Sequence, residues 1–286
     1  MESIYYYLKD VAQYLLNRSQ GRLQDTIVVF PNRRARLFFN HFLSQLSDKP
    51  LWAPRYFTIS DFVQQLSGLV LADNLTLLFR LFRVFREVTG SRESFDTFYF
   101  YCEMILADFD DIDKYRVRAD QLYTNLSDLK AIDDYHEYLG EYQIKTLKEL
   151  REIVNRAKPS EEKQEFISIW DALLRIYREF NRQLDAEGIA YEGRAYRKAI
   201  DIIQSEGSDQ EQTIAFVGFN ALNHSEELLF EHFKKQGNGL FFWDYDMNYI
   251  EKEYHEAGFF LRKYLHRFPA PDDFEGNGSR TVFPAI

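Results

Sequence analysis

Three arginines that follow an apolar run are the side chains in this sequence best suited to binding a ligand. Residues 26–30 (TIVVF) have the composition of a buried strand, and Asn32, Arg33, Arg34 and Arg36 stand where a helical pattern begins. Helix N-terminal amides and guanidinium groups both bind phosphate oxygens, and ligands favour the carboxyl edge of a parallel sheet. A solvated first turn is the alternative, although arginine in that turn opposes the helix dipole. The pattern therefore favours contact with a nucleic-acid backbone.

An acidic run raises the question of a divalent-cation site, because Asp108, Asp110, Asp111 and Asp113 lie close together. A calcium loop requires oxygen ligands at alternate positions and a glycine at the sixth. Counted from Asp108, the fifth and sixth positions are occupied by Ile112 and Asp113. We interpret the run as a solvated helix end and expect no metal there.

No other group of residues has the spacing of a catalytic or metal site. Asp244 and Asp246 follow an apolar run at 240–243, a position where catalytic acids often lie. Neither a Glu-x-Lys sequence nor a histidine pair follows them, so we expect them to cap a turn. The six histidines include no HExxH, and Ser225 beside His224 lies outside any G-x-S-x-G motif. We expect no catalytic residue, no metal and no cofactor in this chain.

The motifs of a nucleotide motor are absent from the sequence. Such a motor carries G-x-x-x-x-G-K-[ST] between its first strand and helix, and no match occurs here. A later strand of a motor presents an acidic pair to magnesium, whereas residues 213–217 (TIAFV) are followed by Gly218, Phe219 and Asn220. The sequence therefore predicts that this chain does not bind and hydrolyse a nucleotide.

Composition restricts the class of protein. The chain is 45% hydrophobic and 17% aromatic, which is typical of a packed globular protein. Its net charge of -10 argues against non-specific coating of nucleic acid, so any such contact must be local. The single cysteine, Cys102, cannot form an internal disulfide or a four-thiolate site. No export signal is recognisable, and arginines interrupt the apolar runs before ~20 residues. We expect a cytoplasmic protein without membrane contact.

Hydrophobic periodicity predicts an α/β fold at both ends of the chain. The expected helices are 4–17, 33–46, 62–69 with Ser60 and Asp61 as N-caps, and 222–235 with a capping box of Asn223 and Glu226. The expected strands are 26–30, 56–59, 213–217 and 240–243.

The middle of the chain contains only helical patterns, and we expect no strand from Asp73 to about Ile203. The expected helices are 75–88, 95–109, 135–157, 165–187 and 191–203. The simplest organisation is one parallel sheet domain, residues 1–72 plus 206–268, interrupted by an all-helical insertion, residues 73–205. Residues 269–286 have the composition of a linker or of the cut end of a longer chain.

Four segments together resemble the AddB-type subunit of bacterial helicase-nucleases, in its N-terminal inactivated helicase region. They are IVVFPNRRARLFF at 27–39, W-x-P-x-x-x-TISDF at 52–62, EGIAYEGRAYRKAI at 187–200 and FVGFNALNHSEELLF at 216–230. The similarity extends in order over residues 1–268, and its most specific parts are Pro-Asn-Arg-Arg and Val-Gly-Phe-Asn.

The resemblance implies a superfamily-one helicase layout, in which a P-loop-helicase-like parallel sheet (1A) carries a helical 1B insertion. It also implies that residues 31–36 correspond to a motif that contacts single-stranded DNA, and that Thr58 and Ser60 belong to a second DNA-contacting segment. Family members add a C-terminal nuclease of the PD-(D/E)xK type that uses Mg²⁺, and many add a four-cysteine iron–sulfur cluster. This chain can carry neither, so we expect it to be a fragment of a longer protein.

The expected function is a non-catalytic, DNA-handling scaffold in a complex that processes double-strand breaks for recombinational repair. Its partners would be single-stranded or unwound DNA and an AddA-type motor helicase-nuclease subunit. The alternative is a protein-interaction module that never contacts DNA, which the acidity of the chain favours.

Overall fold

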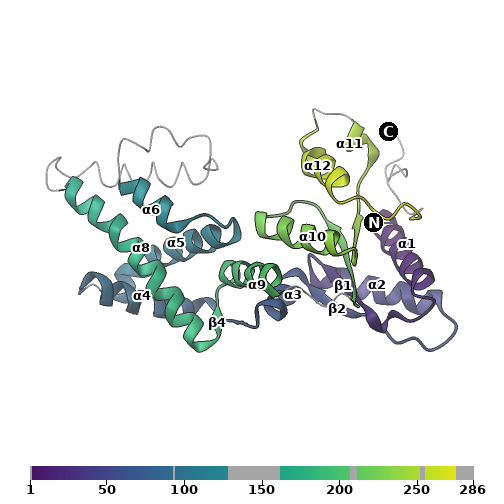
Figure 1. Ribbon diagram of the computed structural model, residues 1–286, viewed down its shortest axis with the longest axis horizontal. Helices are drawn as coiled ribbons and strands as arrows, with labels where there is room; N and C mark the ends of the chain where they lie inside the picture. The colour runs from purple at the N-terminus through teal and green to yellow at the C-terminus, as the bar shows by residue number, and fades with distance from the viewer. Residues whose placement is uncertain (1, 93, 128–161, 207–210, 252–254, 275–286) are drawn as a thin grey trace. The chain divides into compact units, whose positions relative to one another are not determined.

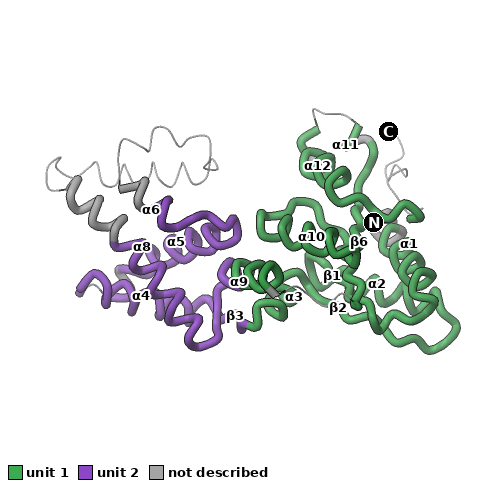
Figure 2. The backbone as a smooth tube through the Cα atoms, in the orientation of Figure 1, with its two compact units in different colours: residues 1–68, 196–286 green, residues 69–195 purple. Residues whose placement is uncertain are grey.

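The computed structural model describes residues 2–92, 94–127, 162–206, 211–251 and 255–274. The helix expected at 135–157 lies outside these ranges. The chain divides into two compact units, drawn in green and purple in Figure 2. Unit 1 comprises Met1–Gly68 and Tyr196–Ile286, and unit 2 comprises Leu69–Ala195. Unit 2 therefore lies, in sequence, between the two parts of unit 1.

Unit 1 is built on a four-stranded sheet in which every neighbouring pair of strands is parallel, which confirms the expected α/β class. Strand β1 (Thr26–Phe30) is buried at all five positions, because a strand covered on both faces must be apolar throughout. In spatial order the strands are β2 (Arg55–Thr58), β1 (Thr26–Phe30), β5 (Thr213–Phe219) and β6 (Gly239–Trp243).

Helices cover both faces of this sheet (Figure 1). On one face, side chains of α1 (Glu2–Arg18) and α2 (Arg33–Leu46) form a core with Val28, Val217 and Phe242. On the other face, aromatic rings of α3 (Ile59–Ser67), of α10 (His224–Gln236) and of Phe268, which follows α12 (Phe259–Arg267), gather around Phe216 and Phe241. Successive strand residues point to opposite faces, which is why each strand supplies both cores.

The order of the strands reverses direction between β1 and β5. From β1 the chain passes through α2 to β2 on one side, and from β5 it passes through α10 to β6 on the other. In open α/β sheets this switch point opens a crevice outside the carboxyl ends of the two neighbouring strands, where ligands bind. The first turns of α2 and α10 stand at that edge.

Unit 2 is mainly helical, and its core includes the fully buried Leu81, Phe109, Phe180 and Leu184. Its helices are α4 (Asn74–Thr89), α5 (Phe95–Lys114), α6 (Ala119–Ser127) and α8 (Glu162–Glu187), followed by the start of α9 (Glu192–Glu206). Two short strands, β3 (Val70–Leu71) and β4 (Ile189–Ala190), pair in parallel.

Strand β4 contradicts the expectation that no strand occurs from Asp73 to Ile203. Gly188 has φ +67°, a left-handed conformation that ends α8 and turns the chain so that Ile189 pairs with Val70. A two-residue strand has no alternation of its own, so periodicity does not reveal it. Short helices α6, α11 (Met247–Glu251) and α12 were likewise not expected.

The residues after α12 contact unit 1 before the described part of the chain ends. The Tyr14 hydroxyl donates to Asp273 at 2.8 Å, and the ring of Phe274 lies 4.9 Å from that of Phe242. Asp273 and Phe274 therefore pack against α1 and β6.

Candidate nucleic-acid interface

Asn32 begins the candidate interface by capping α2. Its side-chain Oδ1 accepts the backbone N–H groups of Arg34 at 3.0 Å and Ala35 at 3.3 Å. These amides have no partner within the helix, so an asparagine at this position satisfies them. Because Oδ1 already accepts these two N–H groups, the side-chain NH2 group of Asn32 is the part that remains for the expected contact with DNA.

The three arginines of the first turn of α2 are all exposed, as their sequence position suggested. Arg33 reaches Asp61 at 3.8 Å, a long and solvated ion pair whose two side chains are 85% and 46% exposed. The Arg36 guanidinium lies 5.3 Å from the centre of the Tyr56 ring. Within the described residues, Arg34 has no side-chain partner. A phosphate group could therefore be bound here without breaking a strong contact.

The second predicted segment lies beside the first because β1 and β2 pair in register. Phe30, the last residue of β1, is the partner of Thr58, the last residue of β2. Both strands end at the same edge, so α2 and α3 begin next to each other. The structure thus brings Thr58 and Ser60 close to the arginine-bearing turn.

Within this second segment the expected caps are wrong. Thr58 is the N-cap of α3, and its hydroxyl accepts the N–H of Asp61 at 3.1 Å. Ser60 and Asp61 lie inside the first turn of the helix, which begins at Ile59. The Thr58 hydroxyl is consequently occupied as an acceptor and retains only its own proton for a ligand, whereas Ser60 is partly buried.

Tyr56 supports the arginines and was not identified from the sequence. Its hydroxyl donates to Asn40 at 3.2 Å, and its ring stacks on Phe30 at 6.3 Å. Burial raises the pKa of the Tyr56 hydroxyl, although the nearby Arg36 acts in the opposite direction. The phenol therefore stays neutral and provides an aromatic face for Arg36. The sequence signal that could have identified Tyr56 is an aromatic residue two positions before the end of a predicted strand.

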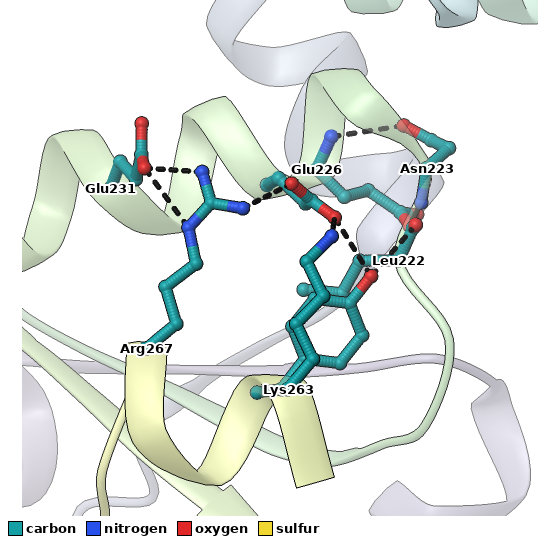
Figure 3. A network of polar contacts seen from close by, with 8 residues as sticks. Leu222, Asn223, Glu226, Glu231, Lys263 and Arg267 are labelled. Atoms are coloured by element: carbon teal, nitrogen blue, oxygen red, sulfur yellow. Dashed lines mark hydrogen bonds and ion pairs between the residues drawn. The ribbon is translucent and has the colours of Figure 1, made fainter. Parts of the chain in front are cut away.

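The other side of the switch point is formed by the end of β5 and the start of α10. Gly218 has φ +75° at an irregularity in the pairing with β6, and its N–H donates to the Tyr7 hydroxyl at 3.1 Å. The predicted capping box is confirmed: Asn223 and Glu226 exchange hydrogen bonds, each at 2.9 Å (Figure 3). The first turn of α10 is therefore firmly held at the same edge as the arginines.

The acidic run of α5 belongs to unit 2, and the interpretation of a solvated helix end is wrong for two of its members. Asp113 is fully buried and accepts the hydroxyls of Tyr177, at 2.5 Å, and Tyr191. Asp110 accepts the N–H of Gly193 at 2.5 Å and pairs with Lys114 at 2.7 Å. These carboxylates join α5 to α8 and to the start of α9. Asp108, in contrast, is exposed.

Gly193 is required for this junction. A Cβ at this position would overlap the carbonyl of Asp110, so any larger residue would push α9 away from α5. Lys114 continues the junction by pairing with Glu192 at 2.6 Å.

Two further properties concern the described residues only. They contain no group of three or more His, Cys, Asp or Glu side chains arranged to hold a metal ion. None of the helices in these ranges combines the length and apolarity required to cross a membrane.

No protein-family model matches the sequence, and no curated protein matches it significantly.

Proposed function

We propose that unit 1 is a non-catalytic, DNA-handling scaffold that binds single-stranded or unwound DNA at the carboxyl edge of its sheet. In this proposal the chain is the inactivated helicase-like part of an AddB-type subunit. It works in the cytoplasm with an AddA-type motor in the processing of double-strand breaks, and it does not itself hydrolyse ATP.

One observation carries the proposal: Arg33, Arg34 and Arg36 are exposed together at a sheet switch point in a chain of net charge -10. Acidic proteins do not attract nucleic acid generally, so a local cluster of guanidinium groups is where a phosphate backbone would bind. The partners of these arginines are a long ion pair and an aromatic ring. Both leave N–H groups available for phosphate oxygens.

The arrangement of the two units also supports the helicase-like interpretation. A parallel sheet with helices on both faces is interrupted in sequence by a mainly helical unit, as the family resemblance leads us to expect. The proposal that unit 1 is non-catalytic depends on the segments after β1 and β5. A nucleotide motor has a phosphate-binding lysine after its first strand and an acidic pair after a later strand, whereas these segments carry Asn32 and Asn220.

The decisive test is the salt dependence of binding to a labelled single-stranded oligonucleotide, measured by fluorescence anisotropy. Neutralised phosphates contribute a slope of about 0.7 each for single strands, so replacing Arg33, Arg34 and Arg36 by Ala should flatten the slope by about 2. Binding at low salt should weaken in parallel.

A matched control removes the same charge from the opposite edge of the sheet. Arg22, Lys49 and Lys235 are exposed and precede β1, β2 and β6 respectively. Their joint replacement by Ala should leave the salt slope unchanged. Equal losses in the two triple variants would refute the proposed site, since they would show that only net charge matters.

The alternative is a protein-interaction module, and exposed aromatic side chains of unit 2 favour it. Phe79 and Phe100 are 47% and 66% exposed. If the wild-type chain binds no oligonucleotide even at low salt, this second function becomes the better explanation.

A further inference from the structure

A row of aromatic side chains on unit 2 leads into a pocket. The Phe79 ring of α4 stacks on Phe95 of α5 with the ring centres 4.2 Å apart, and Phe95 meets Tyr99 edge to face at 5.7 Å. The Tyr99 hydroxyl donates to Glu103 at 2.7 Å, and Glu103 lines the pocket. We call Phe79, Phe95 and Tyr99 the aromatic row, which direct contacts join to the pocket.

The outer members of the aromatic row are exposed. Tyr99 is 38% exposed and Phe79 more so. Leu75, which lies one turn before Phe79 on the same face of α4, is also exposed and extends this surface. Apolar side chains that lie next to one another and remain in contact with water are typical of a surface that binds another molecule.

The pocket at the end of the row lies wholly within unit 2. Its volume is about 360 Å³, at the lower end of the range of ligand pockets. The buried Leu77 of α4 and Leu106 of α5 form part of its wall. An apolar wall of this kind suits the aliphatic stem of a long charged side chain.

The polar part of the pocket wall is acidic, with Glu103, Asp110 and Glu192 contributing to it. Asp110 and Glu192 share one cation, Lys114, at 2.7 Å and 2.6 Å. Glu103 accepts the Tyr99 hydroxyl, which is neutral. One ammonium group thus serves three carboxylates, so the pocket keeps a net negative charge.

This combination of charge and apolar surface defines the chemistry of an occupant. Carboxylates repel the phosphates of a nucleic acid, whereas they attract guanidinium and ammonium groups, which also bind to aromatic faces. Phe95 and Glu103 lie two turns apart on one face of α5, about 11 Å. An occupant that uses both ends must therefore carry a cation and an apolar group at a similar separation, which a segment of protein chain provides.

We propose that the aromatic row and its acidic pocket dock a basic, amphipathic segment of another protein. An arginine or lysine of that segment enters the pocket, and an apolar side chain packs on the row. The inference goes beyond DNA binding by unit 1 and does not depend on it. It also gives the protein-interaction alternative a specific site and a partner of stated chemistry.

The probe is a peptide selected without any assumption about its charge. A library of random peptides displayed on phage is enriched on the full chain, and the strongest binder is synthesised with a fluorescent label. The enriched sequences should combine arginine or lysine with apolar residues. Enrichment of acidic or wholly apolar sequences, or no enrichment at all, would overturn the proposal.

A double-mutant cycle then locates the bound peptide. Glu103→Gln should weaken binding of the selected peptide roughly 3-fold to 10-fold, because it removes one partner of an ion pair. Phe79→Ala should weaken it roughly 5-fold to 30-fold, as expected for an aromatic side chain central to an interface. In a peptide whose basic residue is replaced by norleucine, Glu103→Gln should have no further effect, since both changes remove the same pair.

Matched controls remove the same groups from other parts of unit 2. Glu87 is exposed near the C-terminal end of α4, and Phe100 is exposed on α5 outside the aromatic row. Glu87→Gln and Phe100→Ala should leave binding of the peptide unchanged. Losses equal to those of Glu103→Gln and Phe79→Ala would show that the peptide responds only to overall charge and hydrophobicity, which would refute the site.

This inference and the proposed DNA site can fail separately. The triple Ala variant of Arg33, Arg34 and Arg36 should bind the peptide as tightly as wild type does. If the peptide binds but ignores both Glu103→Gln and Phe79→Ala, the docking site is refuted and the DNA site is unaffected. Sedimentation of wild type alone should show a monomer, and a dimer that Phe79→Ala dissociates would assign the row to a second copy of this chain instead.

Discussion

Removing the buried carboxylate of Asp113 should selectively loosen unit 2. Asp113 is fully buried and accepts the hydroxyls of Tyr177 and Tyr191, which belong to α8 and to the segment before α9. Asp113→Leu keeps a side chain of similar size but no acceptor. Both hydroxyls then lose this acceptor, and the loss is most severe at Tyr191, which is 3% exposed, whereas Tyr177 is partly buried.

The magnitude follows from the number and kind of these bonds. A hydrogen bond to a charged group contributes about 1.5–3 kcal/mol, and a buried group left unsatisfied costs about 1–3 kcal/mol. Two such bonds at the lower limit give a destabilisation of about 3 kcal/mol. Each 1.4 kcal/mol changes an equilibrium tenfold, so the open form of unit 2 should become roughly a hundred times more populated.

Hydrogen exchange measured by mass spectrometry reports this opening for each segment separately. Peptides from α5 and α8 should exchange roughly a hundred times faster in Asp113→Leu, whereas peptides from β1 and β5 should be unchanged. The control is the triple variant with Tyr177→Phe and Tyr191→Phe, in which no hydroxyl is left unpaired and most of the protection should return. If the triple variant exchanges as fast as Asp113→Leu alone, the hydroxyl bonds do not carry the stabilisation.

Two other predictions concern titration and reactivity. Although burial opposes them, three donors on α12 lower the pKa of Glu227 below its ordinary 4.5: Lys263, Tyr264 and Arg267. The stability that this network provides is present above about pH 4.5 and is lost as the pH falls through the lower pKa of Glu227 in the folded protein. Tryptophan emission should therefore report an acid transition that is absent from Glu227→Gln. Persistence of the transition in that variant would contradict this account. Burial raises the pKa of the Cys102 thiol to about 12, so at pH 8 native protein should react with iodoacetamide at least ~100-fold more slowly than urea-unfolded protein, and comparable rates would show that unit 2 opens readily.

Local chemistry made part of this fold readable from the sequence. The run TIVVF is apolar throughout because β1 is covered on both faces, and the expected helix 33–46 matches α2 because its cap and periodicity are local. The capping box at Asn223 was likewise recognisable from two residues three positions apart. Features that depend on partners distant in sequence could not be predicted in this way.

The α3 cap and Asp113 illustrate this second case. Thr58, Ser60 and Asp61 are all good caps, and the choice among them is made by where β2 stops pairing with β1, at Phe30. Similarly, a run of aspartates is typical of a solvated helix end, but two tyrosines from other elements bury Asp113. The arginines of α2 could be singled out from the sequence, whereas Tyr56 could not, since tertiary packing places its ring beside Arg36.

The parallel pairing of β1 with β5 imposes an order on synthesis of the chain. A ribosome that has completed β1 must translate all of unit 2 before β5 emerges, which takes roughly 10 to 40 s at typical elongation rates. During that interval one edge of β1 has no neighbouring strand, while residues 69–195 form a contiguous unit that can fold first. Nascent chains that stall before β5 would therefore present an apolar strand edge to chaperones and to each other.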